Sequence, residues 1–207
     1  MKIICIGRNY AKHAKELGNN VPTEPVYFMK PDSALLPKKQ PFFYPNFTKD
    51  LHYEVELVIK ICKLGKNISK KFANTYYNEI GLGIDFTARD IQLECKAKGL
   101  PWEKAKAFDY SAPLSREFIQ KSEFKNLDDI AFSLEKNGEI VQNGNSQDML
   151  FDFDHLICYI SQFMTLKIGD LIFTGTPAGV GPLKIGDQYT QLIDHQFSMD
   201  LLQQEYL

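Results

Sequence analysis

Two glutamates one residue apart, Glu54 and Glu56, stand within the apolar segment LHYEVELVIKI at residues 51–61. The alternation of this segment predicts a β-strand with both carboxylates on one face, roughly 7 Å apart. A solvated strand face would explain this pair as well as a metal site would. A metal site needs further carboxylates, and the best candidate is Asp85, which ends the apolar segment EIGLGID at residues 79–85.

Three carboxylates without a histidine or cysteine cluster favour a hard cation. Mg²⁺ binds about six oxygen ligands and usually keeps several waters, so positions remain open for a substrate. Zinc is less suitable because it prefers nitrogen and sulfur ligands. Without a cation, Glu54 and Glu56 would repel each other, and one of them would take up a proton. The alternative for Asp85 is a local cap of the helix that we expect to begin after Thr87.

A second candidate pair is His13 and Glu16, in the sequence HAKE. On a helix these two residues share a face because they are three positions apart. Histidine exchanges protons near neutral pH, and a carboxylate partner would orient its ring and raise its basicity. Taken in isolation, an exposed helix with alternating charges is the simpler explanation of this pattern.

Two further segments contain residue types that could do chemistry. Lys106 lies in GLPWEKAKAFD, residues 99–109, near the only tryptophan of the chain. A lysine in an apolar setting can stabilise a developing anion, although most lysines extend to solvent. The loop in GDLIFTGTPAGVGP, residues 169–182, could offer backbone N–H groups to a carboxylate. It lacks the phosphate-binding and dinucleotide-binding fingerprints, and its pattern alone indicates a tight turn.

The elements that would position these residues are mostly strands. The pattern predicts strands at Lys2–Ile6, Val26–Met29, Tyr53–Ile61, Ile80–Phe86, Phe132–Lys136, Glu139–Gln142, Asp170–Phe173 and Gln188–Ile193. Helices are expected at Tyr10–Leu17, at Asp154–Phe163, and from Thr87, whose TARD sequence resembles a capping box, to Gly99. Asn137-Gly138 predicts a two-residue hairpin turn. Because helices do not separate the strands regularly, we expect a mainly β, α+β domain rather than a doubly wound sheet.

Composition narrows the class of protein. A chain of 207 residues with 44% hydrophobic residues is expected to form one domain with a substantial core. Its net charge of −2 gives no electrostatic case for nucleic acid binding. No apolar run approaches the roughly 20 residues that span a bilayer. The four cysteines form no C-x-x-C pair, so we expect a reduced, cytoplasmic protein.

Taken together, the segments resemble the fumarylacetoacetate hydrolase family, and most closely its small members, the acylpyruvases and oxaloacetate decarboxylases. The resemblance covers nearly the whole chain in one register. It is carried by GRNYAKHAKELGN (7–19), YFMKP (27–31), HYEVELVIKI (52–61), GIDFTARDIQ (83–92), GLPWEKAKAFD (99–109), NGEIVQNGNSQDMLF (137–151) and GDLIFTGTPAGVGP (169–182). It implies a mixed β-sandwich roll with a few short helices, usually assembled as a homodimer, with Mg²⁺ or Mn²⁺ in its active site.

The resemblance also implies roles for single residues. Metal ligands fall on Glu54, Glu56 and Asp85. The catalytic dyad of the small members falls on His13 and Glu16, within a segment at about 10–20 that resembles a lid helix. The remaining matches are the active-site lysine at Lys106, contacts to the substrate at Arg89, Gln92 and Thr176, and neighbours of the site at Arg8 and Lys30. Asp32 departs from the family pattern by adding a negative charge near the expected pocket.

The activity implied by the resemblance is metal-dependent cleavage of short 3-acylpyruvate-like 2-keto acids. Hydrolysis of an acylpyruvate and decarboxylation of oxaloacetate both leave pyruvate enolate, so one site could serve either reaction. The alternatives are a keto–enol tautomerase or isomerase of a related dicarboxylic keto acid, and a non-catalytic relative that binds metal and ligand. The sequence does not identify the natural substrate or pathway, or whether the cation is Mg²⁺ or Mn²⁺.

Overall fold

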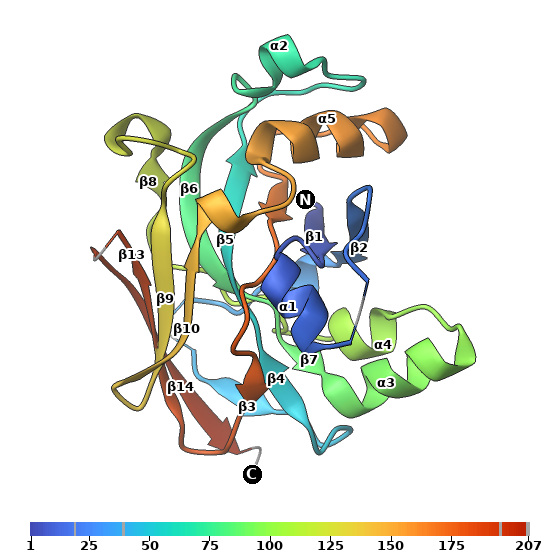
Figure 1. Cartoon of the computed structure of the whole chain (residues 1–207). Helices are drawn as coiled ribbons and strands as arrows, with labels where there is room; N and C mark the ends of the chain where they lie inside the picture. Colours follow the sequence, from blue (N-terminus) through green and yellow to red (C-terminus); the bar gives the residue numbers. More distant parts are fainter. Residues whose placement is uncertain (19, 39, 195, 206–207) are drawn as a thin grey trace.

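The computed structural model describes residues 1–18, 20–38, 40–194 and 196–205, the last of these as backbone only. Its strands form three sheets (Figure 1). The six-stranded sheet has the order β2 (Val26–Lys30), β1 (Ile3–Gly7), β11 (Leu171–Phe173), β5 (Val55–Ile61), β6 (Tyr77–Ile84) and β8 (Ile119–Gln120). The five-stranded sheet has the order β10 (Glu139–Asn145), β9 (Ala131–Lys136), β13 (Gln188–Ile193), β14 (Gln196–Glu205) and β3 (Phe42–Tyr44). The three-stranded sheet contains β12 (Gly181–Pro182), β4 (Leu51–Tyr53) and β7 (Thr87–Ala88).

Short helices connect and cover these sheets. They are α1 (Ala11–Glu16), α2 (Lys70–Ala73), α3 (Arg89–Lys98), α4 (Glu103–Lys106) and α5 (Phe153–Phe163), with 3₁₀ turns η1 (Asp32–Ala34), η2 (Lys121–Glu123) and η3 (Ser146–Asp148). In Figure 1, α3 and α4 lie together at the lower right and α1 lies near the centre, whereas α5 and α2 lie at the top. Among the described residues, no helix has the length and apolar character needed to span a membrane.

The architecture confirms the predicted mainly β, α+β fold. β1 pairs with β11 in parallel, and its other neighbour β2 is antiparallel, so the six-stranded sheet is mixed. The predicted Asn-Gly hairpin is also confirmed. β9 and β10 pair with Lys136 opposite Glu139, and Asn137 and Gly138 have φ angles of 54° and 86°. Two consecutive positive φ angles characterise the type I′ turn that matches strand twist.

The alternation of residues 51–61 separates two apolar clusters. Val55, Leu57, Ile59 and Ile61 belong to the larger core, whereas Val58, on the opposite face of β5, packs in a smaller cluster. This central strand is therefore buried on both faces, as expected for a strand with sheet neighbours and covering layers on each side. The interpretation of its polar face as a solvated surface is wrong.

Several boundaries near the carboxylates differ from the predictions. The expected strand Tyr53–Ile61 is divided at Glu54, which links β4 to β5, and β6 ends at Ile84, before Asp85. Thr87 is not the cap of α3, because its hydroxyl donates to the Asp85 carbonyl at 3.2 Å, and Ala88 precedes the helix without a side-chain cap. The predicted end of this helix is confirmed, since Gly99 adopts the left-handed conformation with a φ of 64°.

Candidate metal centre and active site

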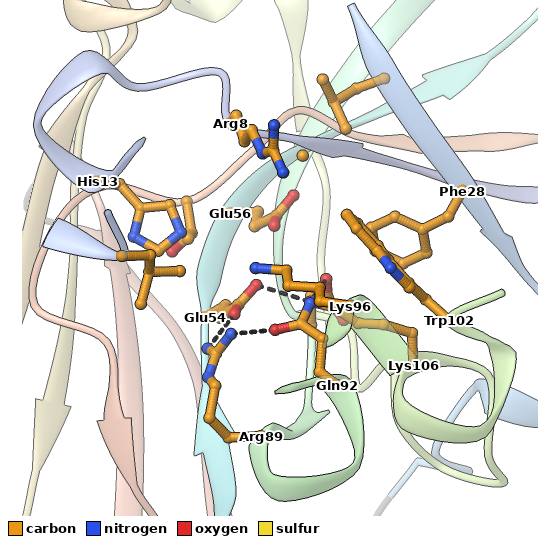
Figure 2. A pocket seen from close by; sticks show the side chains of 15 residues that line it. Arg8, His13, Phe28, Glu54, Glu56, Arg89, Gln92, Lys96, Trp102 and Lys106 are labelled. Carbon is orange, nitrogen blue, oxygen red and sulfur yellow. Dashed lines mark hydrogen bonds and ion pairs between the residues drawn. The ribbon is translucent and has the colours of Figure 1, made fainter. Parts of the chain in front are cut away.

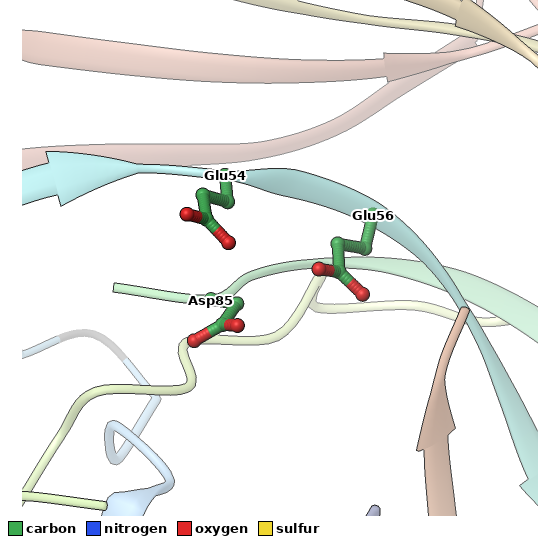
Figure 3. A group of neighbouring side chains, drawn as sticks. All are labelled: Glu54, Glu56 and Asp85. Atoms are coloured by element: carbon green, nitrogen blue, oxygen red, sulfur yellow. The ribbon is translucent and has the colours of Figure 1, made fainter. Parts of the chain in front are cut away.

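Glu54, Glu56 and Asp85 form one buried cluster of carboxylates (Figure 3). Glu54 and Glu56 flank the first residue of β5, and Asp85 follows β6, the antiparallel neighbour of β5. The Asp85 backbone N–H donates to the Glu54 carbonyl at 2.8 Å, which extends the pairing of β5 and β6 to Glu54 and Asp85. One oxygen of each carboxylate lies within 4.8 Å of the others, and the three residues are only 5%, 1% and 1% exposed.

Three buried cations pair with two of these carboxylates. Lys106 Nζ donates to Glu54 Oε2 at 2.8 Å and to Asp85 Oδ2 at 2.6 Å. Lys30 Nζ lies 2.8 Å from Asp85 Oδ1, and the Arg89 guanidinium donates to Glu54 Oε1. Each of these charges would be costly to bury alone, so the cations and the carboxylate cluster depend on one another.

Glu56 is the exception within the cluster. It forms no ion pair with any residue that the structure describes, and its Oε2 accepts the Gly175 N–H at 2.7 Å. Burial raises its pKa well above the ordinary value, and the negative charges of Asp85 and Glu54 raise it further. A divalent cation would neutralise this repulsion, and an all-oxygen donor set of this kind suits Mg²⁺ or Mn²⁺.

The pKa of Glu54 is shifted in the opposite direction from that of Glu56. Burial alone would raise the pKa of Glu54, yet the adjacent Lys106 and Arg89 hold that pKa well below its ordinary value, with a smaller contribution from His13. Glu54 therefore remains ionised, and its charge is already shared with cations of the protein. The two glutamates of the E-x-E pair thus have opposite electrostatic environments although only Val55 separates them in the sequence.

Gln142 holds the glutamate segment against the loop that follows β11. Its Oε1 accepts the Val55 N–H at 2.9 Å, and its Nε2 donates to Thr176 Oγ1 at 2.9 Å and to the Pro177 carbonyl at 3.0 Å. Thr176 in turn donates to the Val55 carbonyl at 2.9 Å. No role for Gln142 was predicted from the sequence, because a glutamine in an alternating strand is typical of a solvated face.

Gly175 is expected to be essential to this arrangement. Its φ of 101° is rarely accessible to L-residues, and a Cβ there would lie 2.7 Å from the Cβ of Asn9. We expect Gly175→Ala to lower the free energy of unfolding by about 2–4 kcal/mol, measured by denaturant unfolding. Gly186→Ala is the matched control, because Gly186 has a similar φ of 92° with nothing within 4 Å of the added Cβ. Equal losses for both variants would mean that the contact with Asn9 has no effect.

His13 and Glu16 on α1 form the predicted pair. His13 Nδ1 lies 3.1 Å from Glu16 Oε2, and Glu16 Oε1 accepts the Gly179 N–H at 3.0 Å. His13 is buried and lines the same pocket as the carboxylates. The alternative of an exposed helix is therefore wrong for His13, and α1 is tied through Glu16 to the loop that supplies Thr176.

The pocket brings together most of the residues singled out in the sequence (Figure 2). Its cavity volume is about 30 Å³, room for only a few water molecules. The described lining residues that matter here are Arg8, His13, Glu54, Glu56, Asp85, Arg89, Gln92, Lys96, Lys106 and Thr176, beside the aromatic rings of Phe28 and Trp102. Of these, Lys96 did not emerge from the sequence.

Lys30 and Asp32, which were expected near the site, are not among the residues that line the pocket. Lys30 is buried behind Asp85, where it also donates to the carbonyls of Phe86 and Ser111, and it is not among the residues that line the pocket. Asp32 is exposed in η1 and is likewise not among the lining residues. The negative charge of Asp32 therefore does not face the described pocket, contrary to the expectation from the sequence.

Comparison with known proteins gives a consistent result. The family model described as fumarylacetoacetate (FAA) hydrolase C-terminal matches residues 2–200. The chain is 49% identical over 186 residues to a mitochondrial oxaloacetate decarboxylase of Dictyostelium discoideum, covering 89% of this chain and 85% of the relative. It is 45% identical over 194 residues to the oxaloacetate tautomerase YcgM of Escherichia coli, covering 93% and 88% of the two chains.

A similar solved structure is the fumarylpyruvate hydrolase of Pseudomonas aeruginosa in complex with Mn²⁺ and pyruvate. It superimposes with a TM-score of 0.93 at 34% sequence identity, covering 100% of this chain and 90% of the other. The similarity therefore extends over the strands, loops and helices that surround the pocket.

Proposed function

Because the chain belongs to the fumarylacetoacetate hydrolase family, we propose that it is a divalent-cation-dependent enzyme that acts on oxaloacetate, moving the proton at C3 between the keto and enol forms. Loss of CO₂ from the same substrate is the related reaction that this site could catalyse. The observation that carries the proposal is the buried His13, which pairs with the exposed Glu16 and lines a pocket that also contains three carboxylates. Two relatives named for oxaloacetate reactions support the choice of substrate.

Glu54, Glu56 and Asp85 would hold the cation. Their fit is supported by the converging buried oxygens and by the unrelieved repulsion at Glu56. When bound, the divalent cation supplies Lewis-acid polarisation of the substrate's keto group. The Mn²⁺ in the fumarylpyruvate hydrolase structure supports a cation of this class, and we propose Mg²⁺ or Mn²⁺.

His13 would exchange the proton. With its Nδ1–H donated to Glu16, the basic atom of the ring is Nε2, which can accept a proton from C3 and return it to the enol oxygen or carbon. Glu16 orients the ring and stabilises its protonated form. For decarboxylation no proton is taken from C3, and a protonated His13 would instead donate a proton to C3 of the enolate after CO₂ has left.

Lys106 would stabilise the negative charge that develops on the substrate. Burial alone would lower the pKa of Lys106, but Asp85 and Glu54 raise that pKa above its ordinary value, so the side chain is a fixed positive charge rather than a base. Arg89, which also donates to Gln92 Oε1 at 2.6 Å, and Thr176 would contact the carboxylate and keto groups of the substrate.

The helix α1 would act as a lid. The cavity of about 30 Å³ is too small for a four-carbon acid, so entry requires the pocket to open. Movement of α1 would separate Glu16 from Gly179 and carry the His13–Glu16 pair away, so that the dyad would face the three carboxylates only when the pocket closes.

The purified chain tests this proposal directly. With Mg²⁺ or Mn²⁺, we expect it to accelerate the loss of enol-oxaloacetate absorbance in the ultraviolet, and to lose this activity in EDTA and regain it with the metal. Pyruvate formation, followed with lactate dehydrogenase, distinguishes decarboxylation from tautomerisation. If the rate with metal equals the rate of the metal alone at matched concentration, the proposed activity is wrong.

Hydrolysis of an acylpyruvate is the second candidate, favoured by the similarity to the fumarylpyruvate hydrolase. In that reaction His13 would deprotonate a water rather than C3. Acetylpyruvate turnover would identify it. A non-catalytic role is the remaining alternative, and it predicts binding of oxalate without turnover of any 2-keto acid. The homodimer and the cytoplasmic location expected from the sequence stay predictions.

A further inference from the structure

One face of α3 points three polar side chains into the pocket. Arg89, Gln92 and Lys96 are spaced by three and four residues, which places them on one side of a helix, and all three line the pocket. Leu93 and Glu94, on the opposite side, are exposed. Arg89 and Gln92 are the residues of this helix expected to contact the substrate. Lys96 lies one turn further along the same face and has no role in the proposed reaction.

Two cations of the pocket, Arg8 and Lys96, are not balanced by its carboxylates. The three carboxylates carry three negative charges, and the cations paired with them carry three positive charges, so these groups sum to zero: Glu54, Glu56 and Asp85 against Lys30, Lys106 and Arg89. Arg8 and Lys96 also line the pocket, and neither forms an ion pair with a carboxylate in the described part of the chain. A bound divalent cation would add to this positive excess.

These two cations lie close enough to affect each other. Burial lowers the pKa of Lys96, and the positive charges of Arg8 and Arg89 lower it further. The Lys96 ammonium lies 5.6 Å from the centre of the Trp102 ring, which holds the side chain beside the pocket. Arg8 has a φ of 62°, a conformation that is unfavourable for a residue other than glycine and is often found at functional sites. Figure 2 shows Arg8 and Lys96 around the same space as Glu54 and Glu56.

We propose that Arg8 and Lys96 bind the second carboxylate of a 2-keto dicarboxylate and so make the enzyme selective for dianionic substrates. This inference rests on the proposed function and names the side chains that choose among its substrates. The first carboxylate and the keto oxygen belong at the end of the pocket formed by Glu54, Glu56 and Asp85. A second carboxylate between Arg8 and Lys96 would satisfy two cations that otherwise repel each other.

The test compares a dianion with a monoanion of similar length. For Lys96→Met, we expect kcat/KM for oxaloacetate to fall about 10- to 100-fold, mainly through KM, because one charge-assisted contact to the substrate is lost. For acetylpyruvate, kcat/KM, or its inhibition constant against oxaloacetate if it is not turned over, should change less than about threefold. Arg8→Met should act in the same direction, and Lys96→Arg should retain the preference for oxaloacetate.

Lys98→Met is the matched control, because Lys98 is on the same helix but exposed, where it pairs with Glu94. It should leave both substrates unaffected. If Lys96→Met weakens both substrates equally, or neither, the subsite is wrong while the proposed function stands. If the wild-type protein turns over neither substrate, the proposed function is wrong, and the subsite with it. Unchanged thermal unfolding midpoints would show that the variants are folded.

Discussion

Replacing Glu56 by glutamine is expected to abolish tight binding of Mn²⁺ and Mg²⁺ without unfolding the protein. Among the carboxylates, Glu56 is the best position for this test, because it has no cationic partner among the described residues. The glutamine oxygen can still accept the Gly175 N–H that now bonds Glu56 Oε2 at 2.7 Å. The change therefore removes one of three anionic ligands while preserving size and a hydrogen bond.

The expected effect of Glu56→Gln on stability, relative to the wild type, differs between the metal-free and the metal-loaded protein. In the metal-free state, Glu56→Gln should unfold at the same or higher denaturant concentration than the wild type, because a buried group repelled by Asp85 and Glu54 loses its charge. Added Mn²⁺ at a hundredfold excess over its Kd should stabilise the wild type by about 2.7 kcal/mol and the variant by far less. Calorimetry should show an affinity reduced by more than about 100-fold.

A control separates the site from general effects of charge. Glu139 is exposed in β10, and Glu139→Gln should leave Mn²⁺ binding unchanged. Glu54→Gln is less informative, since it would leave Arg89 without its carboxylate partner and Lys106 with Asp85 alone, and so reduce stability by itself. Wild-type Mn²⁺ affinity in Glu56→Gln would place the cation elsewhere in the protein.

The sequence predicted the carboxylate cluster better than the details of its strands. Alternation along residues 51–61 placed Glu54 and Glu56 on one face, and this held although the strand divides at Glu54. The alternation could not show whether Glu54 and Glu56 are solvated or buried, because the sequence pattern is the same whether water or buried cations stabilise the two carboxylates. That choice depended on Lys106 and Arg89, which are distant in sequence and approach only when α3 and α4 pack beside the sheet.

Gln142 and Lys96 were not predicted from the sequence, because their roles depend on contacts that form only in the folded chain. Gln142 contacts Val55 and Thr176 from a different sheet, and nothing in its neighbourhood distinguishes it from a surface glutamine. Lys96 was hidden among the other charges of α3, and only the direction of the helix shows which of them face the pocket. The TARD pattern was misleading in the opposite way, since a local capping signal was overridden by the pairing of Thr87 in β7.

Replacing His13 by alanine is expected to lower kcat for oxaloacetate by about 10²- to 10⁴-fold while oxalate and Mn²⁺ still bind. The loss falls on kcat because the imidazole would act on a proton of the reacting carbon, whereas the carboxylates that would hold the cation are untouched. Calorimetry with Mn²⁺ and then oxalate measures the retained binding. Lys15→Gln, an exposed change on the same short helix, should leave kcat within about twofold.

Glu16→Gln makes the argument for a dyad sharper. The glutamine can still accept the Gly179 N–H, so α1 keeps its attachment, but it no longer stabilises a positive charge on His13. We expect kcat to fall about 10- to 100-fold, because the positive charge that develops on His13 during proton transfer is no longer stabilised by a carboxylate. Unchanged kcat in Glu16→Gln would mean that Glu16 does not assist the proton transfer. Equal activity of His13→Ala and wild type would instead assign the proton transfer to another group in the pocket.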